Sequence, residues 1–221
     1  MTSTIESTVH ERAASRDAVL QVVIPHARGK KVLDIGCVEH STENINQGRV
    51  WVHEELRKAS SHLTGIDILD EDISVLKQRG FNVQVQSAET FGFDETFEVI
   101  FAGELIEHLS NAGLFLDQCS KHLSRDGTLI LTTPNAYNIY EIGKVVAHWS
   151  NDPYANPEHT CWYSPTVIRT LLGRHGFRVI EMHFVDYPYI KPRLKHRLAS
   201  MLSALFGRKF KTTMIVVAKH S

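Results

Sequence analysis

Two acidic residues, each closing a short apolar run, constrain the fold of this chain more than any other feature. The first run, Val32-Leu33-Asp34-Ile35-Gly36, is typical of a buried parallel strand that breaks into a tight turn. The second, Leu63-Thr64-Gly65-Ile66-Asp67-Ile68, is again an apolar strand closed by an acid. In open α/β sheets such turns direct backbone N–H groups at a ligand, and such acids hold ribose hydroxyls. Together the two runs predict a nucleoside cofactor.

Strand-like and helix-like segments alternate after the first run, which implies βαβ units with right-handed crossovers and a largely parallel sheet. A helix over Thr8–Ile24, stopped by Pro25 and Gly29, is predicted to cover that sheet. Asp70 or Asp72 can cap a later helix that Gly80 ends. The predicted fold is a Rossmann-like, mostly parallel seven-stranded sheet with helices on both faces. Its strands are expected within 30–36 and at 63–68, 82–87, 97–102, 128–133, 177–185 and 213–217.

The chain is expected to form one domain, because 221 residues with 43% hydrophobic content can bury one sizeable core. A lid segment is expected at about 136–163, after the fifth strand, with a short helix at Ile142–Trp149. Ser164 and Pro165 mark the start of the next helix. The polar start of the chain has no apolar signal region, and no run approaches the length of a membrane-spanning helix. The widely spaced Cys37, Cys119 and Cys161 signal neither disulfides nor zinc, so we expect a cytoplasmic protein.

A basic segment stands out against the near-zero net charge. Lys191–Lys211 holds seven Lys or Arg and no acid, which leaves 17 basic against 25 acidic residues elsewhere. Apolar residues at about 191–207 suit one face of a helix between the last two strands. Such a helix can pack on the domain, lie on a membrane surface or contact RNA. We favour the packed helix, with peripheral membrane contact second.

Several motifs occur in the order seen in class I S-adenosylmethionine-dependent methyltransferases. As an ordered set from Lys30 to Val185 they are specific, although each alone is weak. The chain resembles most the branch that contains the ubiquinone-biosynthesis O-methyltransferases and many bacterial sugar and natural-product methyltransferases. The motifs are Val32–Cys37, Gly65–Ile68, Ala88-Glu89, Glu104–Leu109, Asp126-Gly127, Thr132–Asn135 and the late Tyr163-Ser164-Pro165, Leu171-Leu172 and Gly176-Phe177.

The resemblance implies S-adenosyl-L-methionine as cofactor and S-adenosyl-L-homocysteine as product. It places the methionine part at the turn of Asp34 and Gly36, the ribose at Asp67 and the adenine on Ile68. The full set that it implies is Asp34, Gly36, Cys37, Asp67, Ile68, Ala88, Glu89 and Gly103. One departure stands out: the family usually has glycines where this chain has Val38 and His40. A Cβ there either displaces the cofactor or requires a reshaped loop.

A second group of polar residues follows the fourth strand. Glu104, Glu107 and His108 are spaced i, i+3 and i+4, which on a helical turn places them on one face, toward the acceptor. His159, in the lid, can close over the same place. We assign Glu104, His108 and His159 to catalysis, because a hydroxyl acceptor must lose its proton to a base or to a metal. The simpler alternative is that the acids favour a helix N-terminus and the histidines are ordinary polar residues.

The same four residues suggest a metal hypothesis. Glu104, Glu107, His108 and His159 resemble the Glu-x-x-Glu-His…His site of the 3′-terminal small-RNA 2′-O-methyltransferases. Two carboxylates with two imidazoles suit Mg²⁺ or Mn²⁺. Quinone and sugar methyltransferases carry similar runs, so the motif does not by itself indicate RNA.

Three functions remain open at this point. The first is O-methylation of a small hydroxylated acceptor, such as a sugar or glycan precursor, a phenol or a natural product. The second is RNA 2′-O-methylation, which requires salt-sensitive RNA binding through basic residues and is the less favoured partner choice. The third is a non-catalytic protein that keeps the cofactor fold. The sequence does not identify the acceptor, since fold does not fix substrate.

Overall fold

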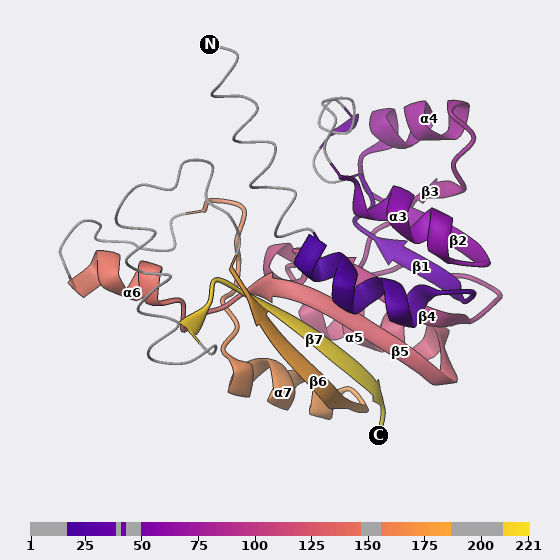
Figure 1. Cartoon of the computed structure of the whole chain (residues 1–221). Helices are drawn as coiled ribbons and strands as arrows, with labels where there is room; N and C mark the ends of the chain where they lie inside the picture. The colour runs from indigo at the N-terminus through magenta and orange to yellow at the C-terminus, as the bar shows by residue number, and fades with distance from the viewer. Residues whose placement is uncertain (1–16, 39–40, 43–49, 147–155, 187–209) are drawn as a thin grey trace, which may run out of the picture.

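A computed structural model describes residues 17–38, 41–42, 50–146, 156–186 and 210–221, and one seven-stranded sheet forms its centre (Figure 1). The strands lie in the order β3-β2-β1-β4-β5-β7-β6. Neighbours from β3 to β5 are parallel, whereas β7 is antiparallel to β5 and β6. The predicted Rossmann-like, mostly parallel sheet is therefore confirmed. The strands are β1 Lys31–Ile35, β2 His62–Asp67, β3 Val83–Val85, β4 Phe97–Gly103, β5 Leu123–Pro134, β6 Phe177–Val185 and β7 Thr213–His220.

Helices cover both faces of the sheet (Figure 1). Side chains of α5 and α7 pack with Ile100 and Ala102 of β4, whereas those of α3 and of a helix over residues 17–27 pack with Val99 and Phe101. Successive residues of a strand point to opposite faces, so one apolar strand fills two core layers. The helices are α3 Val52–Ala59, α4 Asp70–Gln78, α5 Ala112–His122, α6 Ile139–Val146 and α7 Pro165–Arg174, with the short 3₁₀ helix η1 Ile106–His108.

Two predicted helix boundaries are wrong. Pro25 does not stop the first helix, which runs on to residue 27 and is followed by Gly29 at a φ of 68°. Val23 and Ala27 are fully buried there, so core packing outweighs the hydrogen bond that proline cannot donate. Neither Asp70 nor Asp72 is the N-cap of α4, because Leu69 occupies that position.

Other boundaries are confirmed. The Gly80 N–H donates to the Lys77 carbonyl and the Phe81 N–H to the Leu76 carbonyl, the pattern of a Schellman motif. Ser164 caps α7, with Pro165 at its first position. The lid helix α6, Ile139–Val146, begins before the expected Ile142, and its expected end at Trp149 lies outside the described residues.

Some predictions fall on residues that the structure does not describe. These include the whole of the expected basic helix at about 191–207 and the first half of the Thr8–Ile24 helix. Within the described part of the chain, every helix is too short or too polar to cross a bilayer.

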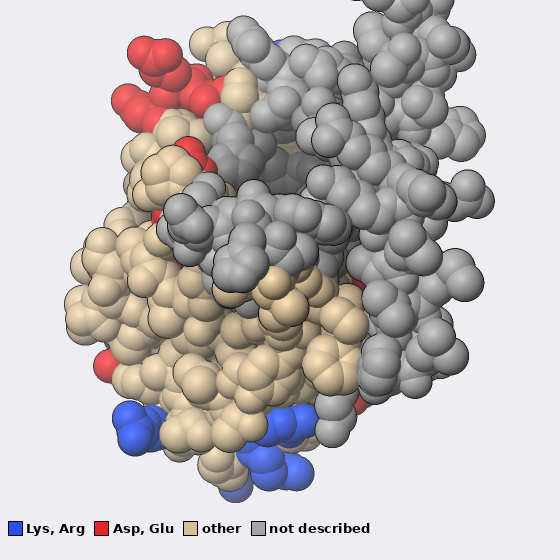
Figure 2. Space-filling view, turned by 90° about the vertical axis from the view of Figure 1, so that its left-hand side faces the viewer, with Lys and Arg blue, Asp and Glu red and all other residues tan. Residues whose placement is uncertain are grey.

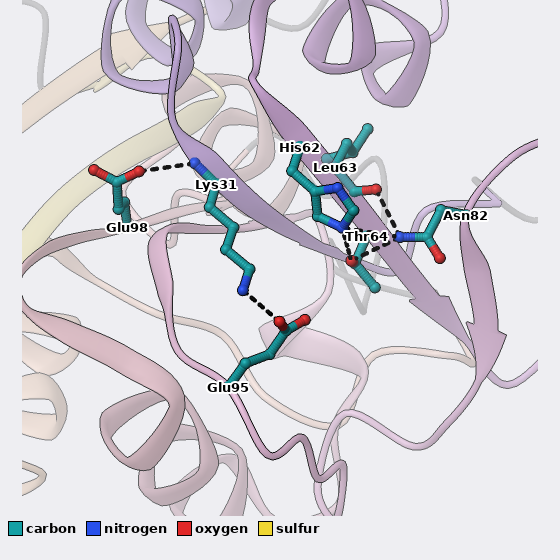
Figure 3. Close-up of polar contacts among 7 residues, drawn as sticks. All are labelled: Lys31, His62, Leu63, Thr64, Asn82, Glu95 and Glu98. Atoms are coloured by element: carbon teal, nitrogen blue, oxygen red, sulfur yellow. Dashed lines mark hydrogen bonds and ion pairs between the residues drawn. The ribbon is translucent and has the colours of Figure 1, made fainter.

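The strands begin at an edge that we call the amino-end edge, where polar contacts fix their register (Figure 3). The Lys31 N–H donates to Glu98 at 3.0 Å, and the Lys31 ammonium contacts Glu95. The Asn82 amide donates to the Leu63 carbonyl at 3.1 Å and to the Thr64 hydroxyl at 2.9 Å. The candidate site lies at the opposite edge, where the parallel strands end.

Candidate active site

The parallel strands end at what we call the carboxyl-end edge, and most of the predicted site residues lie there. Gly36 and Cys37 follow β1, and Asp67 ends β2. Gly103 ends β4, and the segment to η1 supplies Glu104, Glu107 and His108. Parallel strands bring their carboxyl ends together, so residues far apart in the sequence meet at one place.

The turn after β1 does not direct its first N–H groups at a ligand, contrary to the prediction. The Gly36 and Cys37 N–H groups both donate to the Ile66 carbonyl, at 2.9 and 3.3 Å, and the Val38 N–H donates to Asp67 Oδ2 at 3.0 Å. Gly36 itself has a φ of 82°, the left-handed region that glycine adopts without strain. The turn is thus tied to β2, and Val38 is buried among apolar side chains.

Asp67 accepts three backbone hydrogen bonds beside this turn. Its Oδ1 accepts from the N–H groups of Ile68 and Leu69, at 2.8 and 3.2 Å. Burial raises the pKa of Asp67; its three backbone hydrogen bonds oppose the shift, and the negative charge of Asp34 adds to it. Hydroxyl donors from a ligand would offset part of this burial.

The predicted adenine edge contains one exposed residue, Ile68, beside residues that are buried or hydrogen-bonded. The Ile68 side chain is 68% exposed although it is large and apolar, which suits a flat ligand ring. Ala88 is buried, and Glu89 accepts from the Asn111 N–H at 2.7 Å, where α5 begins. A Cβ on Gly103 would lie 2.9 Å from the Phe101 ring, so glycine is needed where β4 ends.

Glu104 does not share a helical turn with Glu107 and His108, and this prediction is wrong. Its φ is 48°, and the 3₁₀ helix begins only at Ile106. The Glu104 N–H donates to the carbonyl and to the hydroxyl of Thr132, at 3.0 and 2.9 Å. The end of β5 therefore holds Glu104 in a conformation that propensity would not favour.

Glu107, His108 and His159 nevertheless come together. One ligand atom of each lies within 4.8 Å of the others, and the two imidazole rings meet edge to face at 4.7 Å. The contact is secured by Thr160, whose N–H donates to the Glu107 carbonyl at 2.8 Å and whose hydroxyl lies 2.7 Å from the Leu109 carbonyl. The predicted approach of the lid histidine to η1 is thus observed.

Buried polar atoms without partners gather in this place. Among the described residues, Glu104 Oε1, Glu107 Oε1 and His159 Nδ1 are buried and make no hydrogen bond. An unsatisfied buried polar atom destabilises a fold by about 1–3 kcal/mol, so such atoms are rare. Three of them in one cluster indicate that a ligand completes the site.

Burial also changes the acidity of these groups. It raises the pKa of Glu107 to about 9, with a further contribution from the negative charge of Glu104. It raises the pKa of Glu104 to about 7, against a hydrogen bond from Thr132. Burial lowers the pKa of His159, and His108 lowers it further. A divalent cation would supply the positive charge that these buried carboxylates lack, and carboxylate and imidazole are ligand types that such a cation accepts.

Three further residues support the site, and none of them was predicted from the sequence as a site residue. The Thr133 hydroxyl donates to Glu107 Oε2 at 2.9 Å, which leaves Oε1 as the unpartnered oxygen. Thr160 anchors the lid, and His53 pairs with Asp34. Thr133 belongs to the motif Thr132–Asn135, and Thr160 is next to His159 in the sequence. Their positions could therefore have indicated a role at the site. His53 gave no such signal.

Comparison with known proteins gives one family match. The family described as methyltransferase domain matches residues 8–182. The ubiquinone biosynthesis O-methyltransferase of Bos taurus, a mitochondrial protein, is 29% identical over 184 residues, which cover 74% of this chain and 47% of the relative. The enzyme of that name from Nitrobacter winogradskyi is 26% identical, covering 72% of this chain and 60% of the relative. The chain thus spans about half the length of the curated relatives it matches.

Solved structures share the fold. A SAM-dependent methyltransferase from Archaeoglobus fulgidus superposes with a TM-score of 0.65 at 19% identity, covering 97% of both chains. Magnesium protoporphyrin IX methyltransferase from Synechocystis, solved with bound SAH, gives 0.61 at 16% identity, covering 99% of this chain and 86% of the other.

Proposed function

This chain belongs to the methyltransferase domain family, and we propose that it is a class I S-adenosylmethionine-dependent enzyme that methylates a hydroxyl oxygen of a small acceptor. The observation that carries the proposal is the cluster of Glu107, His108 and His159 beside the cofactor edge. The ubiquinone O-methyltransferases among its relatives support oxygen as the acceptor atom.

In this proposal the cofactor lies along the carboxyl-end edge. The ribose hydroxyls donate to Asp67, adenine packs on the exposed Ile68, and the methionine part lies toward Asp34. The remaining contacts come from Gly36, Cys37, Ala88, Glu89 and Gly103. A carboxylate that already accepts backbone N–H groups is held in one orientation, and its charge strengthens each hydrogen bond that it accepts.

The reaction is an in-line displacement at the methyl carbon. The acceptor oxygen forms the new C–O bond as the C–S bond breaks, and the bonding pair stays on sulfur, which becomes a neutral thioether. Alignment of the two reactants in a dry site can supply much of the rate. The hydroxyl proton must leave as well, and the residues of the cluster serve this second need.

We propose that Glu107, His108 and His159 hold a divalent cation. Glu104 is near enough that its negative charge raises the pKa of Glu107. A bound Mg²⁺ or Mn²⁺ would lower the pKa of the acceptor hydroxyl. The unpartnered Glu107 Oε1 and His159 Nδ1 would complete their bonding there. In the metal-free alternative His159 accepts the proton directly, and its lowered pKa favours the neutral ring that a base must present.

RNA binding requires cations close to the reacting group. On the side toward which the parallel strands run, the described Lys and Arg side chains lie mainly along the lower rim (Figure 2), and most of the basic segment Lys191–Lys211 lies outside the described residues. RNA 3′ ends are therefore included in the test of the acceptor. Peripheral membrane contact through Lys191–Lys211 remains a separate proposal, which sedimentation with anionic vesicles would test.

The test is methyl transfer from labelled S-adenosylmethionine to a panel of phenols, catechols, sugars and short RNA 3′ ends. We expect a phenol, catechol or sugar to be methylated, loss of activity with chelator and recovery with Mg²⁺ or Mn²⁺. Activity that persists in chelator would select the metal-free base. Methylation of RNA alone would replace the small acceptor.

A further inference from the structure

A buried pair of an aspartate and a histidine, Asp34 and His53, lies beneath the turn after β1. His53 Nδ1 is 2.7 Å from Asp34 Oδ2, and the side chains are 1% and 4% exposed. Since a carboxylate only accepts, the imidazole N–H donates. Asp34 lies near the end of β1, two residues before Gly36, and His53 lies in the first turn of α3. The pair therefore joins the two ends of the connection that carries the cofactor turn.

The surrounding residues are shaped to admit this imidazole. A Cβ on Gly65 would lie 2.6 Å from His53 Cε1 and 2.8 Å from Cys37 Sγ, so only glycine leaves room. The ring packs against Trp51 and Phe81, with centroids 4.9 and 5.9 Å away. Gly65, within β2, thus leaves the space that the His53 ring occupies.

Further hydrogen bonds close the same turn. The Trp51 indole N–H donates to the Cys37 carbonyl at 2.8 Å, and the Val38 N–H donates to Asp67 Oδ2 at 3.0 Å. The turn is therefore held by two side chains from the start of α3 and by the acid of β2. Glycines would let a ligand approach a bare backbone, whereas here the chain builds a fixed wall from side chains.

Stability alone does not account for the pair. Replacing a buried ion pair by apolar residues of similar volume is often neutral or stabilising, because burial removes both groups from water. Among the described residues, the only other carboxylate of comparable burial is Glu107, in the cluster beside the cofactor edge. A buried acid at this edge is thus better explained by a ligand than by the fold.

We propose that His53 is a positioning residue of the cofactor site: it holds the Asp34 carboxylate and, with Trp51, the turn Gly36–Val38 in place for the amino-acid end of the cofactor. The inference rests on the proposed function, which brings the methionine part to Asp34. The chemistry recognised is the α-ammonium group, a natural partner for a fixed carboxylate. At Val38, where the family usually has glycine, the turn has this side-chain support instead.

The experiment compares two ligands on the full-length protein by calorimetry. S-Adenosylhomocysteine carries the amino-acid end, whereas 5′-methylthioadenosine has the same adenosine and thioether without it. His53→Phe keeps a ring but removes the donor. We expect it to weaken S-adenosylhomocysteine binding by roughly 10-fold or more, as for loss of a hydrogen bond to a charged group, and to change methylthioadenosine binding little.

Rescue and control variants separate positioning from folding. His53→Asn places an amide N–H near the former Nδ1 and should restore most of the S-adenosylhomocysteine affinity. Trp51→Phe removes the indole N–H together with part of the ring, and should reproduce the selective loss more weakly even if His53→Phe does not fold. His175→Phe is the matched control, because His175 Nδ1 also lies 2.7 Å from a carboxylate, that of Asp117, between α7 and α5.

Equal losses for both ligands would show that His53 only supports the fold and would overturn the proposal. So would unchanged binding of both ligands in His53→Phe and Trp51→Phe. A wild-type protein that binds neither ligand would instead contradict the proposed function, and this inference with it.

Discussion

The two edges of the central sheet carry the same kinds of charged residue in opposite circumstances. At the amino-end edge, Lys30 Nζ lies 2.8 Å from Glu98, and these side chains are 49% and 45% exposed. At the carboxyl-end edge, Glu104, Glu107 and His159 have buried polar atoms without partners. The charged groups of the amino-end edge are paired and exposed to water. Those of the carboxyl-end edge are buried and have polar atoms without hydrogen-bond partners.

This difference separates stability from function. Exposed ion pairs contribute about 0–1 kcal/mol to the free energy of unfolding. The ion pairs of the amino-end edge therefore help to fix the strand register but add little stability. The carboxyl-end edge loses stability through unsatisfied atoms and raised pKa values, and proteins keep such arrangements mainly at functional sites. The comparison predicts that substitutions at the two edges affect different properties.

The largest effect is expected from the cluster itself. Alanine at His159 removes a metal ligand or the base, so kcat should fall roughly 10²–10⁴-fold, while S-adenosylhomocysteine affinity, measured by calorimetry, stays unchanged. The same substitution at His108 should weaken Mn²⁺ binding. Full activity in both variants would leave alignment alone as the source of rate and would break the comparison.

The next effect concerns the cofactor acid. Asp67→Ala removes the proposed acceptor of the ribose hydroxyls and should weaken S-adenosylhomocysteine binding by about 1.5–3 kcal/mol, the range for hydrogen bonds to charged groups. Titration calorimetry measures it, with Glu98→Gln as the control acid. Equal affinities in wild type and Asp67→Ala would place the ribose elsewhere.

A smaller loss is expected when the support of Glu107 is removed. Thr133→Val keeps the shape but deletes the hydroxyl that donates to Glu107 Oε2, so Mn²⁺ affinity should fall about 10–100-fold. Thr133→Ser should restore it. Thr128→Val, a buried threonine on the same strand, should bind Mn²⁺ as wild type does. If both valine variants behave alike, the hydroxyl of Thr133 does not orient the ligand.

The stability of the metal-free protein should depend on pH through Glu107. Its pKa is about 9 in the folded protein and near the ordinary 4.5 when unfolded, so the folded state holds more protons between these values. The free energy of unfolding should therefore fall as pH rises through this window, by at least about 1 kcal/mol. Urea unfolding at several pH values measures this, and Glu107→Gln should flatten the slope. A slope unchanged by that substitution would contradict the assigned burial.

The smallest effect belongs to the amino-end edge. Glu98→Gln weakens the contacts with Lys30 and the Lys31 N–H, both at an exposed site, and should destabilise the protein by no more than about 1 kcal/mol. Methyl transfer should be unchanged. A large loss of activity would mean that the two edges are not separate in function.

Much of the fold could be read from local patterns, because buried strands and their closing acids are written in consecutive residues. The same holds for Ser164, Pro165 and Gly80, whose roles depend on neighbours in the chain. The prediction for Glu104 was wrong because its spacing alone suggests a helical turn. In the structure Thr132 of β5 accepts from the Glu104 N–H, and Glu104 has a φ of 48°.

The support of the site could not be read in this way. His53 looks like any polar residue of an amphipathic helix, and only the glycine at 65 together with the buried Asp34 reveals its place. Thr133 reaches Glu107 across 26 positions of sequence. Such contacts depend on the three-dimensional arrangement of strands, which spacing does not encode.

The most direct test of the central claim is a crystal structure of the protein with S-adenosylhomocysteine and Mn²⁺, using anomalous scattering to locate the metal. We predict a manganese peak among Glu107, His108 and His159, with the ribose on Asp67 and the amino-acid end toward Asp34. A structure in which the cofactor occupies this edge but the three side chains contact no metal would contradict the metal assignment. Cofactor density away from the carboxyl-end edge would contradict the account as a whole.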